Sequence, residues 1–99
     1  MLIEDFNKYS NKDLLEKSDI LICINYNYNK FIIPKNIKYI YIYNLYSNII
    51  INHDIISLQI QNIQYHNLIF NYNIDELYVY QYTEDIYEYT YEYNYIYIN

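Results

Sequence analysis

The stretch Asn36–Asn44, NIKYIYIYN, contains the clearest local signal in the chain. Ile40 and Ile42 alternate with tyrosines in it, so that every second side chain is a branched aliphatic one. Side chains on a β-strand point alternately to its two faces, and β-branched residues pack well on a pleated surface. The stretch therefore predicts a strand with Ile40 and Ile42 on a buried face and the tyrosines on the opposite face.

The same pattern returns along the chain at a period of 18 to 19 residues. Four blocks align, residues 31–48, 49–67, 68–86 and 87–99. Five columns of the alignment are apolar or aromatic in every block, and a sixth column is an amide in three of them. These columns are Phe31, Ile49, Leu68, Tyr87; Ile33, Ile51, Phe70, Tyr89; Ile37, Ile55, Ile74, Tyr93; Ile40, Leu58, Leu77, Ile96; Ile42, Ile60, Val79, Ile98; and the amides Asn44, Asn62, Gln81.

A repeat of this length predicts a solenoid, because one coil of about 19 residues has room for one short strand. Strands of successive coils then stack as a parallel sheet, about 4.8 Å apart. A weaker coil at residues 13–30 precedes the four blocks, with Leu15, Ile22 and Ile24 in the inward columns. The predicted fold is thus a mostly β repeat solenoid over residues 20–99, with a short parallel sheet.

Composition offers a competing explanation for the repeat. Ile, Tyr and Asn supply 21, 18 and 15 of the 99 residues, and Ala, Gly, Arg and Trp are absent. The abundant residues have AT-rich codons and the absent ones mostly GC-rich codons, so we attribute this usage to an AT-rich genome. The blocks nevertheless differ at residues such as Leu58, Gln59, Glu76 and Val79, which simple codon repetition does not explain. We therefore interpret the repeat as real.

The length predicts one domain, and 54% hydrophobic residues argue against disorder. No apolar run approaches the ~20 residues of a membrane span. The start, MLIEDFNK, has acidic residues where a signal peptide has a basic flank and an apolar stretch. A single Cys cannot form an internal disulfide, which fits a reducing compartment. We expect a soluble, intracellular, cytoplasmic protein.

The formal net charge of −6 is unevenly distributed. All six lysines lie in residues 1–38, whereas residues 39–99 contain seven acids and no lysine. An acidic surface repels nucleic acid and anionic membranes. It is more compatible with a basic or neutral protein as the partner. We therefore expect a protein partner, which the sequence does not identify, and neither nucleic acid nor membrane.

The segment IPKNIKYIYI (33–42) resembles the P-x-x-L-x-x-L-x-V core of short leucine-rich repeats, of the bacterial effector type or the amoebal FNIP type. Pro34 matches the proline, Ile37 and Ile40 the two leucines, and Ile42 the valine-like position. The resemblance covers residues 31–99 and implies leucine-rich-repeat-like coils that bind ligands through the strand face. The amide column, however, comes one residue before the family's Asn, whose side chains form a ladder between coils.

The segment SNKDLLEKS (10–18) predicts a short helix, with Ser10 as its cap and Asp13 as the capping-box partner. Leu2, Ile3 and Phe6 suggest one or two helical turns before it. We predict that residues 1–19 form a helical N-terminal cap, since solenoids need their open end covered. A docking helix for a partner is the alternative.

The other end of the predicted solenoid has no cap. Its last strand, YIYIN (95–99), would leave unpaired backbone groups on an open edge, which invites self-association. Four nearby acids would oppose pairing of that edge with a second chain by charge repulsion: Glu84, Asp85, Glu88 and Glu92. Alternatively, the chain is the first part of a longer repeat array, which the incomplete last block favours.

No residue pattern in the chain predicts catalysis, a cofactor or a metal site. His53 and His66 lie in corresponding loops, without further ligands nearby, and we expect both to be solvated. Cys23 is expected to face outward from the first strand, and no base can be named for it. Adjacent acids such as Asp75 and Glu76 point to opposite faces of a strand. A small enzyme or metal protein is the least favoured alternative.

The outward positions of the predicted sheet form a tyrosine-rich surface interrupted by amides. Tyrosine offers a large, rigid contact area and a hydroxyl, and is therefore common on protein-binding surfaces. We expect non-catalytic protein binding there, although cross-strand aromatic rows also stabilise a sheet without any ligand. A truncated repeat fragment with a purely structural role is the alternative. The candidate binding residues are Tyr39, Tyr41, Tyr43, Gln59, Gln61, Tyr78, Tyr80, Tyr95 and Tyr97.

Overall fold

The computed structural model describes residues 2–10, 12–63, 68–70, 73–79, 81–83, 88–90 and 95–97. Within them the chain forms short β-strands and one 3₁₀ helix, η1 (Asp13–Lys17). The strands are β1 (Leu2–Phe6), β2 (Ile20–Tyr26), β3 (Tyr39–Leu45), β4 (Ile55–Ile63), β5 (Leu68–Phe70), β6 (Ile74–Val79), β7 (Gln81–Thr83), β8 (Glu88–Thr90) and β9 (Tyr95–Tyr97).

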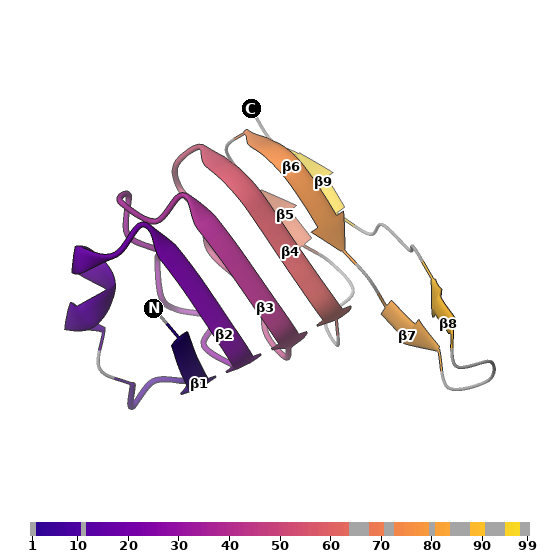
Figure 1. Ribbon diagram of the computed structural model, residues 1–99, viewed down its shortest axis with the longest axis horizontal. Coiled ribbons are helices and arrows are strands. Elements are labelled where there is room, and N and C mark those ends of the chain that lie inside the picture. Colours follow the sequence, from indigo (N-terminus) through magenta and orange to yellow (C-terminus); the bar gives the residue numbers. More distant parts are fainter. Residues whose placement is uncertain are drawn as a thin grey trace.

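Five strands form one parallel sheet in the order β1-β2-β3-β4-β6. After β2 and after β3 the chain passes behind the sheet before it returns as the next strand, whereas η1, between β1 and β2, lies beside the sheet (Figure 1). The chain thus winds as a parallel β-solenoid of about 4 turns. The predicted mostly β solenoid with a short parallel sheet is confirmed.

The strand register confirms the two central columns of the sequence alignment. Residues of one column are direct register partners in neighbouring strands, and they point into the core. The two inward rows are Ile40–Leu58–Leu77 and Ile42–Ile60–Val79. Leu77 is half-buried against the core, and the other five are buried. Alternation over residues 40–42 therefore predicted both the strand and its buried face.

The remaining columns close the core from behind. Ile32 and Ile50 form a parallel bridge at the back of the coils, where the Ile33 amide donates to the Ile50 carbonyl at 3.0 Å. Beside this bridge and before each strand lie the other predicted inward residues. Those that are buried are Ile33, Ile37, Ile49, Ile51, Ile55 and Ile74, with Phe31 packed against them.

A further buried column follows the amides. Phe6, Tyr26, Leu45 and Ile63 are successive register partners, and all are buried. At the first coil the Phe6 ring stacks on Tyr26 with centroids 5.0 Å apart, and it lies 5.1 Å from the Phe31 ring. These aromatic rings fill the core at the β1 end of the solenoid.

The predicted helical N-terminal cap over residues 1–19 is wrong. Leu2–Phe6 forms β1, which pairs in parallel with β2, and η1 is a single short 3₁₀ segment without a side-chain cap bond. Ser10 instead accepts a hydrogen bond from the Asn7 amide at 2.9 Å. As a strand, the segment pairs its backbone with β2 and adds Phe6 to the core, whereas so short a helix is marginally stable alone.

The register of the first coil also differs from the prediction by one residue. Leu21 and Cys23 pair with Ile40 and Ile42 and are fully buried, so Cys23 does not face outward. Ile22 and Ile24 are the outward residues instead. The aligned block assumed a spacing of 18, whereas Asn25 and Asn44, which are register partners, lie 19 residues apart. A one-residue slip exchanges the two faces of a strand.

The predicted fourth coil at residues 87–99 is not formed as a continuation of the sheet. β9 pairs in parallel with β5, so that Ile96 is the partner of Ile69 and not of Leu77. β7 and β8 pair with each other as an antiparallel hairpin. Among the described residues β9 has one strand partner, β5, and the predicted self-association through the last strand stays a prediction. Tyr87, Tyr93 and Ile98 lie outside the described residues.

Candidate binding face

The outer face is the side of the five-stranded sheet that points away from the core. One row crosses all five strands, because its members are successive register partners. This row is Leu2, Ile22, Tyr41, Gln59 and Tyr78. A second row is Ile20, Tyr39, Ser57 and Glu76. A third row, two residues beyond the first row along the strands, is Glu4, Ile24, Tyr43 and Gln61.

Six of the nine predicted binding residues lie on the outer face: Tyr39, Tyr41, Tyr43, Gln59, Gln61 and Tyr78. Tyr43 and Tyr78 keep 52% and 46% of their surface exposed, and the other four are half-buried. Tyr80 lies outside the described residues. Tyr95 and Tyr97 belong to β9, which pairs with β5, so they do not extend the rows of this sheet. The binding role of all nine remains a prediction.

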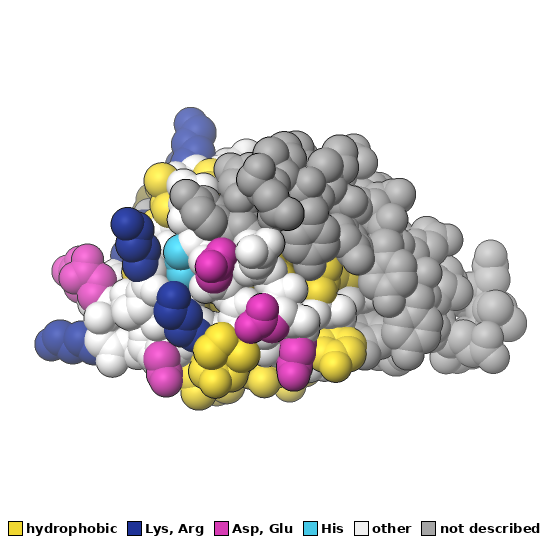
Figure 2. Space-filling view, turned by 90° about the horizontal axis from the view of Figure 1, so that it is seen from above, with side chains coloured by type: hydrophobic (Ala, Val, Ile, Leu, Met, Phe, Trp, Pro, Cys, Tyr) yellow, Lys and Arg dark blue, Asp and Glu magenta, His cyan; other side chains and the backbone are white. Residues whose placement is uncertain are grey.

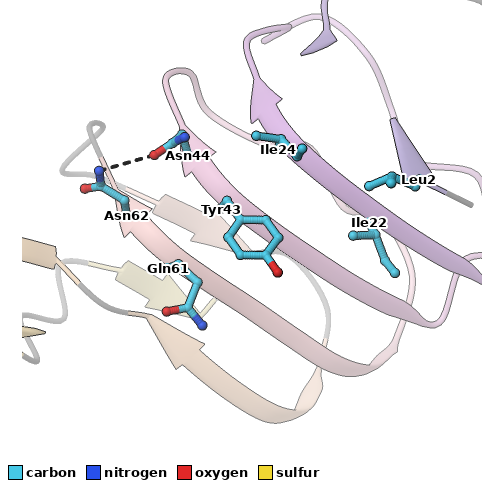
Figure 3. Close-up of a pocket in the computed structure, with 7 residues that line it drawn as sticks. All are labelled: Leu2, Ile22, Ile24, Tyr43, Asn44, Gln61 and Asn62. Atoms are coloured by element: carbon cyan, nitrogen blue, oxygen red, sulfur yellow. Dashed lines mark hydrogen bonds between the residues drawn. The ribbon is translucent and has the colours of Figure 1, made fainter. Parts of the chain in front are cut away.

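A shallow hollow of about 570 Å³ opens on the outer face between β1 and β4. The Tyr43 ring stands between the isoleucines of β2 and Gln61 of β4 (Figure 3). A second hollow of about 330 Å³ adjoins it and adds Tyr41 and Gln59 to the lining. None of the lining residues is charged. The remaining residues that line the first hollow are Leu2, Ile22, Ile24, Asn44 and Asn62.

The amides at the edge of this hollow are held in a hydrogen-bonded ladder. Asn62 Nδ2 donates to Asn44 Oδ1 at 3.2 Å, and Asn44 Nδ2 donates to Asn25 Oδ1 at 3.0 Å (Figure 3 shows the first of these bonds). Asn25 Nδ2 in turn donates to Asp5 Oδ1 at 2.8 Å. All three bonds run toward the first coil and end on a carboxylate, which only accepts.

This ladder stands one residue before the position at which short leucine-rich repeats have their Asn. At the residue after each amide, where the resemblance predicts an Asn, Leu45 and Ile63 are buried in the column that begins at Phe6. The strand therefore continues through the amide, which lines the hollow, and the next side chain enters the core.

Sequence reasoning missed the aliphatic part of the face, namely Leu2, Ile22 and Ile24. Leu2 was assigned to a helix, and the two isoleucines were assigned to the core through the one-residue slip. Aligning Asn25 with Asn44, the amide of the next coil, gives the observed register. The amide column was therefore the sequence signal that determines the strand register of the first coil.

His53 is buried, although the sequence predicted a solvated side chain. Its Nε2 donates to the Ile37 carbonyl of the preceding coil at 2.6 Å, so the ring ties two coils together. His66 lies outside the described residues.

Burial raises the pKa of the Cys23 thiol to about 12, which disfavours the thiolate needed for nucleophilic attack near neutral pH.

Among the described residues, no group of three His, Cys, Asp or Glu side chains is placed to share a metal ion. No helix in that part of the chain has the length and apolar character needed to cross a bilayer. Comparisons of the whole chain with protein-family models, with curated proteins and with solved structures gave no match.

Proposed function

We propose that this chain is a non-catalytic, protein-binding repeat module that uses the outer face of its sheet. The observation that carries this proposal is the row Leu2–Ile22–Tyr41–Gln59–Tyr78, which presents apolar, aromatic and amide side chains across all five strands. On the opposite face, the neighbouring inward row is packed into the core.

Exposure favours binding over a purely structural role for these side chains. Tyr43, Tyr78 and Leu2 keep 52%, 46% and 66% of their surface exposed, so aromatic and apolar area remains available to a partner. The hollow beside Tyr43 offers apolar walls together with amides that can donate and accept hydrogen bonds, and protein interfaces combine apolar contact with such bonds.

We also propose that the coils are of the leucine-rich-repeat kind. The sequence P-x-x-I-x-x-I-x-I at residues 34–42 and the asparagine ladder support this assignment. The position of the amides, one residue earlier than in the family, marks this chain as a variant of that pattern. Binding through the strand face is what the family resemblance implies.

A displayed library of random peptides tests the proposal, with enrichment on the immobilised chain as the readout. Tyr41→Ser combined with Tyr43→Ser should abolish the enrichment, because aromatic side chains near the centre of an interface carry much of its binding energy. Tyr46→Ser is the matched control, since Tyr46 is 49% exposed and lies outside both hollows. Equal enrichment on all three proteins would place binding on another surface, and no enrichment on any of them would support a purely structural role.

A further inference from the structure

The charges of the five-stranded sheet are confined to its two edge strands. β1 contains Glu4 and Asp5, and β6 contains Asp75 and Glu76; all four are exposed. The three strands between them, β2, β3 and β4, contain no charged residue, and none of the five strands contains a lysine. An uncharged centre is therefore flanked by acids on both sides.

Two of these acids belong to the outer face. Glu76 lies in the row with Ser57 and Tyr39, at the beginning of the strands. Ile3 of β1 is the register partner of Cys23 in β2. The next residues, Glu4 and Ile24, therefore lie level with each other, toward the end of the strands. The two carboxylates thus occupy opposite corners of the face. Seen from above, acidic and hydrophobic side chains alternate along the lower border in Figure 2, the side that faces the reader in Figure 1.

The separation of the corners sets the length of a matching ligand. From β1 to β6 there are four strand-to-strand steps of about 4.8 Å, and along the strands the corners are offset by about four residues of 3.3 Å, so they are roughly 23 Å apart on the diagonal. An extended peptide advances about 3.3 Å per residue and spans this distance with about seven residues. The two hollows lie between the corners and accept uncharged side chains.

We propose that the partner binds through an extended segment of this length, with an uncharged, apolar centre and a Lys or Arg toward each end. The segment lies diagonally across the strands, its centre against Tyr43, Tyr41 and Ile22 and its basic ends near Glu4 and Glu76. This inference rests on the proposed protein-binding function and adds to it the chemistry of the ligand. The centre supplies most of the affinity, whereas the exposed end pairs select among ligands and speed association.

Three pools of labelled peptides test this inference by fluorescence anisotropy against the intact chain. Each pool has about five randomised uncharged positions between fixed ends, which are Lys in the first pool, Ser in the second and Glu in the third. We expect the Lys-ended pool to bind roughly 3- to 10-fold more tightly than the Ser-ended pool, from two exposed ion pairs, and the Glu-ended pool to bind most weakly.

Glu→Gln variants assign the effect to the two corners. Glu4→Gln with Glu76→Gln should bring the Lys-ended and Ser-ended pools to the same affinity, whereas Glu16→Gln, an exposed acid in η1, should not. A preference for Lys ends that survives the double variant would overturn the inference, because general attraction to an acidic chain would explain it. Equal binding of all three pools to the intact chain would also overturn the inference.

The outcome also separates this inference from the function on which it rests. If the pools bind without regard to their ends and Tyr41→Ser with Tyr43→Ser removes the binding, the protein-binding face stands and the basic ends are wrong. If no pool binds the intact chain, both the ligand chemistry and the binding function of this face are wrong. Far-ultraviolet circular dichroism and melting curves of each variant show that lost binding is not lost folding.

Discussion

Leu58 lies in the centre of the inward row, between Ile40 and Leu77, and is fully buried. Leu58→Ala removes three carbon atoms, Cγ and its two methyl groups, from a packed core and leaves a cavity. We expect the free energy of unfolding to fall by about 2–5 kcal/mol, measured by urea denaturation. Gln59→Ala, the neighbouring half-buried residue of the outer face, should change it by less than about 0.5 kcal/mol. Equal losses at both positions would contradict the observed register.

Cys23 and Tyr26 make the stability of the fold sensitive to alkaline pH. Burial raises the pKa of both groups above the ordinary values of 9.0 and 10.0. Both are neutral when protonated, so their contribution is complete below about pH 9 and is lost as pH rises toward 12 and beyond. Each group contributes a slope of at most about 1.4 kcal/mol per pH unit over this range.

Denaturation in urea between pH 8 and about pH 11 measures this slope. Cys23→Val with Tyr26→Phe should flatten it, because neither replacement ionises. The Tyr26 hydroxyl has no hydrogen-bond partner among the described residues, so Tyr26→Phe should leave stability at pH 7 unchanged or raise it. An unchanged slope in the double variant would show that other groups cause the alkaline loss.

Among the elements, the asparagine ladder makes a separable contribution at the ends of the strands. Asn44 both donates to Asn25 and accepts from Asn62, so it joins three coils. Asn44→Ala removes both bonds, and we expect a loss of about 1–3 kcal/mol in the free energy of unfolding. Asn44→Asp should recover little of this at neutral pH, since a carboxylate cannot donate to Asn25 Oδ1.

Asn29→Ala is the control for these variants, because Asn29 is exposed in the loop after β2. It should change stability by less than about 0.5 kcal/mol. If Asn44→Asp is as stable as the unmodified chain, the direction of the bonds is not the one described, and the ladder does not hold the coils in the proposed way.

The elements also show which parts of the fold were predictable from sequence. Ile40, Ile42, Leu58 and Ile60 gave the correct strands and faces because aliphatic and polar side chains alternate there. β1 was missed because its five residues contain two acids and offer little periodicity. The tyrosine-rich segment at residues 87–99 was misassigned because tyrosine suits either face of a strand, so alternation carries little information about pairing there.

The candidate binding face was predictable only where the strands were. The tyrosines of β3 and the glutamines of β4 followed from alternation, whereas Ile22 and Ile24 depended on a register that differed by one residue. The confinement of charge to the two edge strands could not be seen beforehand, because β1 had not been identified as a strand. That pattern arises from pairing between segments about 20 residues apart, such as Asp5 with Asn25.

For the whole molecule, the two ends of the solenoid determine how copies of the chain meet. In the part of the chain that the structure describes, β1 and β6 end the sheet order, and each pairs with one strand of this sheet. Their exposed acids, Glu4, Asp5, Asp75 and Glu76, repel a second copy near neutral pH, as charges on edge strands commonly do. These two edges of the sheet are therefore where we expect self-association.

We predict that self-association increases as pH falls from 7 toward the pI of about 4.6, because the acids lose their charge. β6 of one copy would pair with β1 of the next, a head-to-tail contact that leaves a free edge at each end and so produces open chains of copies. Light scattering against pH at fixed concentration measures this, and scattering should rise steeply near pH 5.

Leu2→Lys distinguishes pairing at this edge from general loss of repulsion. Leu2 is 66% exposed on β1, and a lysine there remains charged at pH 5 and opposes pairing of that edge. Tyr9→Lys changes the net charge equally at a residue that is 83% exposed in the loop after β1. Leu2→Lys should suppress the rise in scattering, and Tyr9→Lys should only shift it to slightly higher pH, in step with the pI. Equal suppression by both variants, or a chain that stays monomeric at pH 5, would show that the sheet edges do not pair.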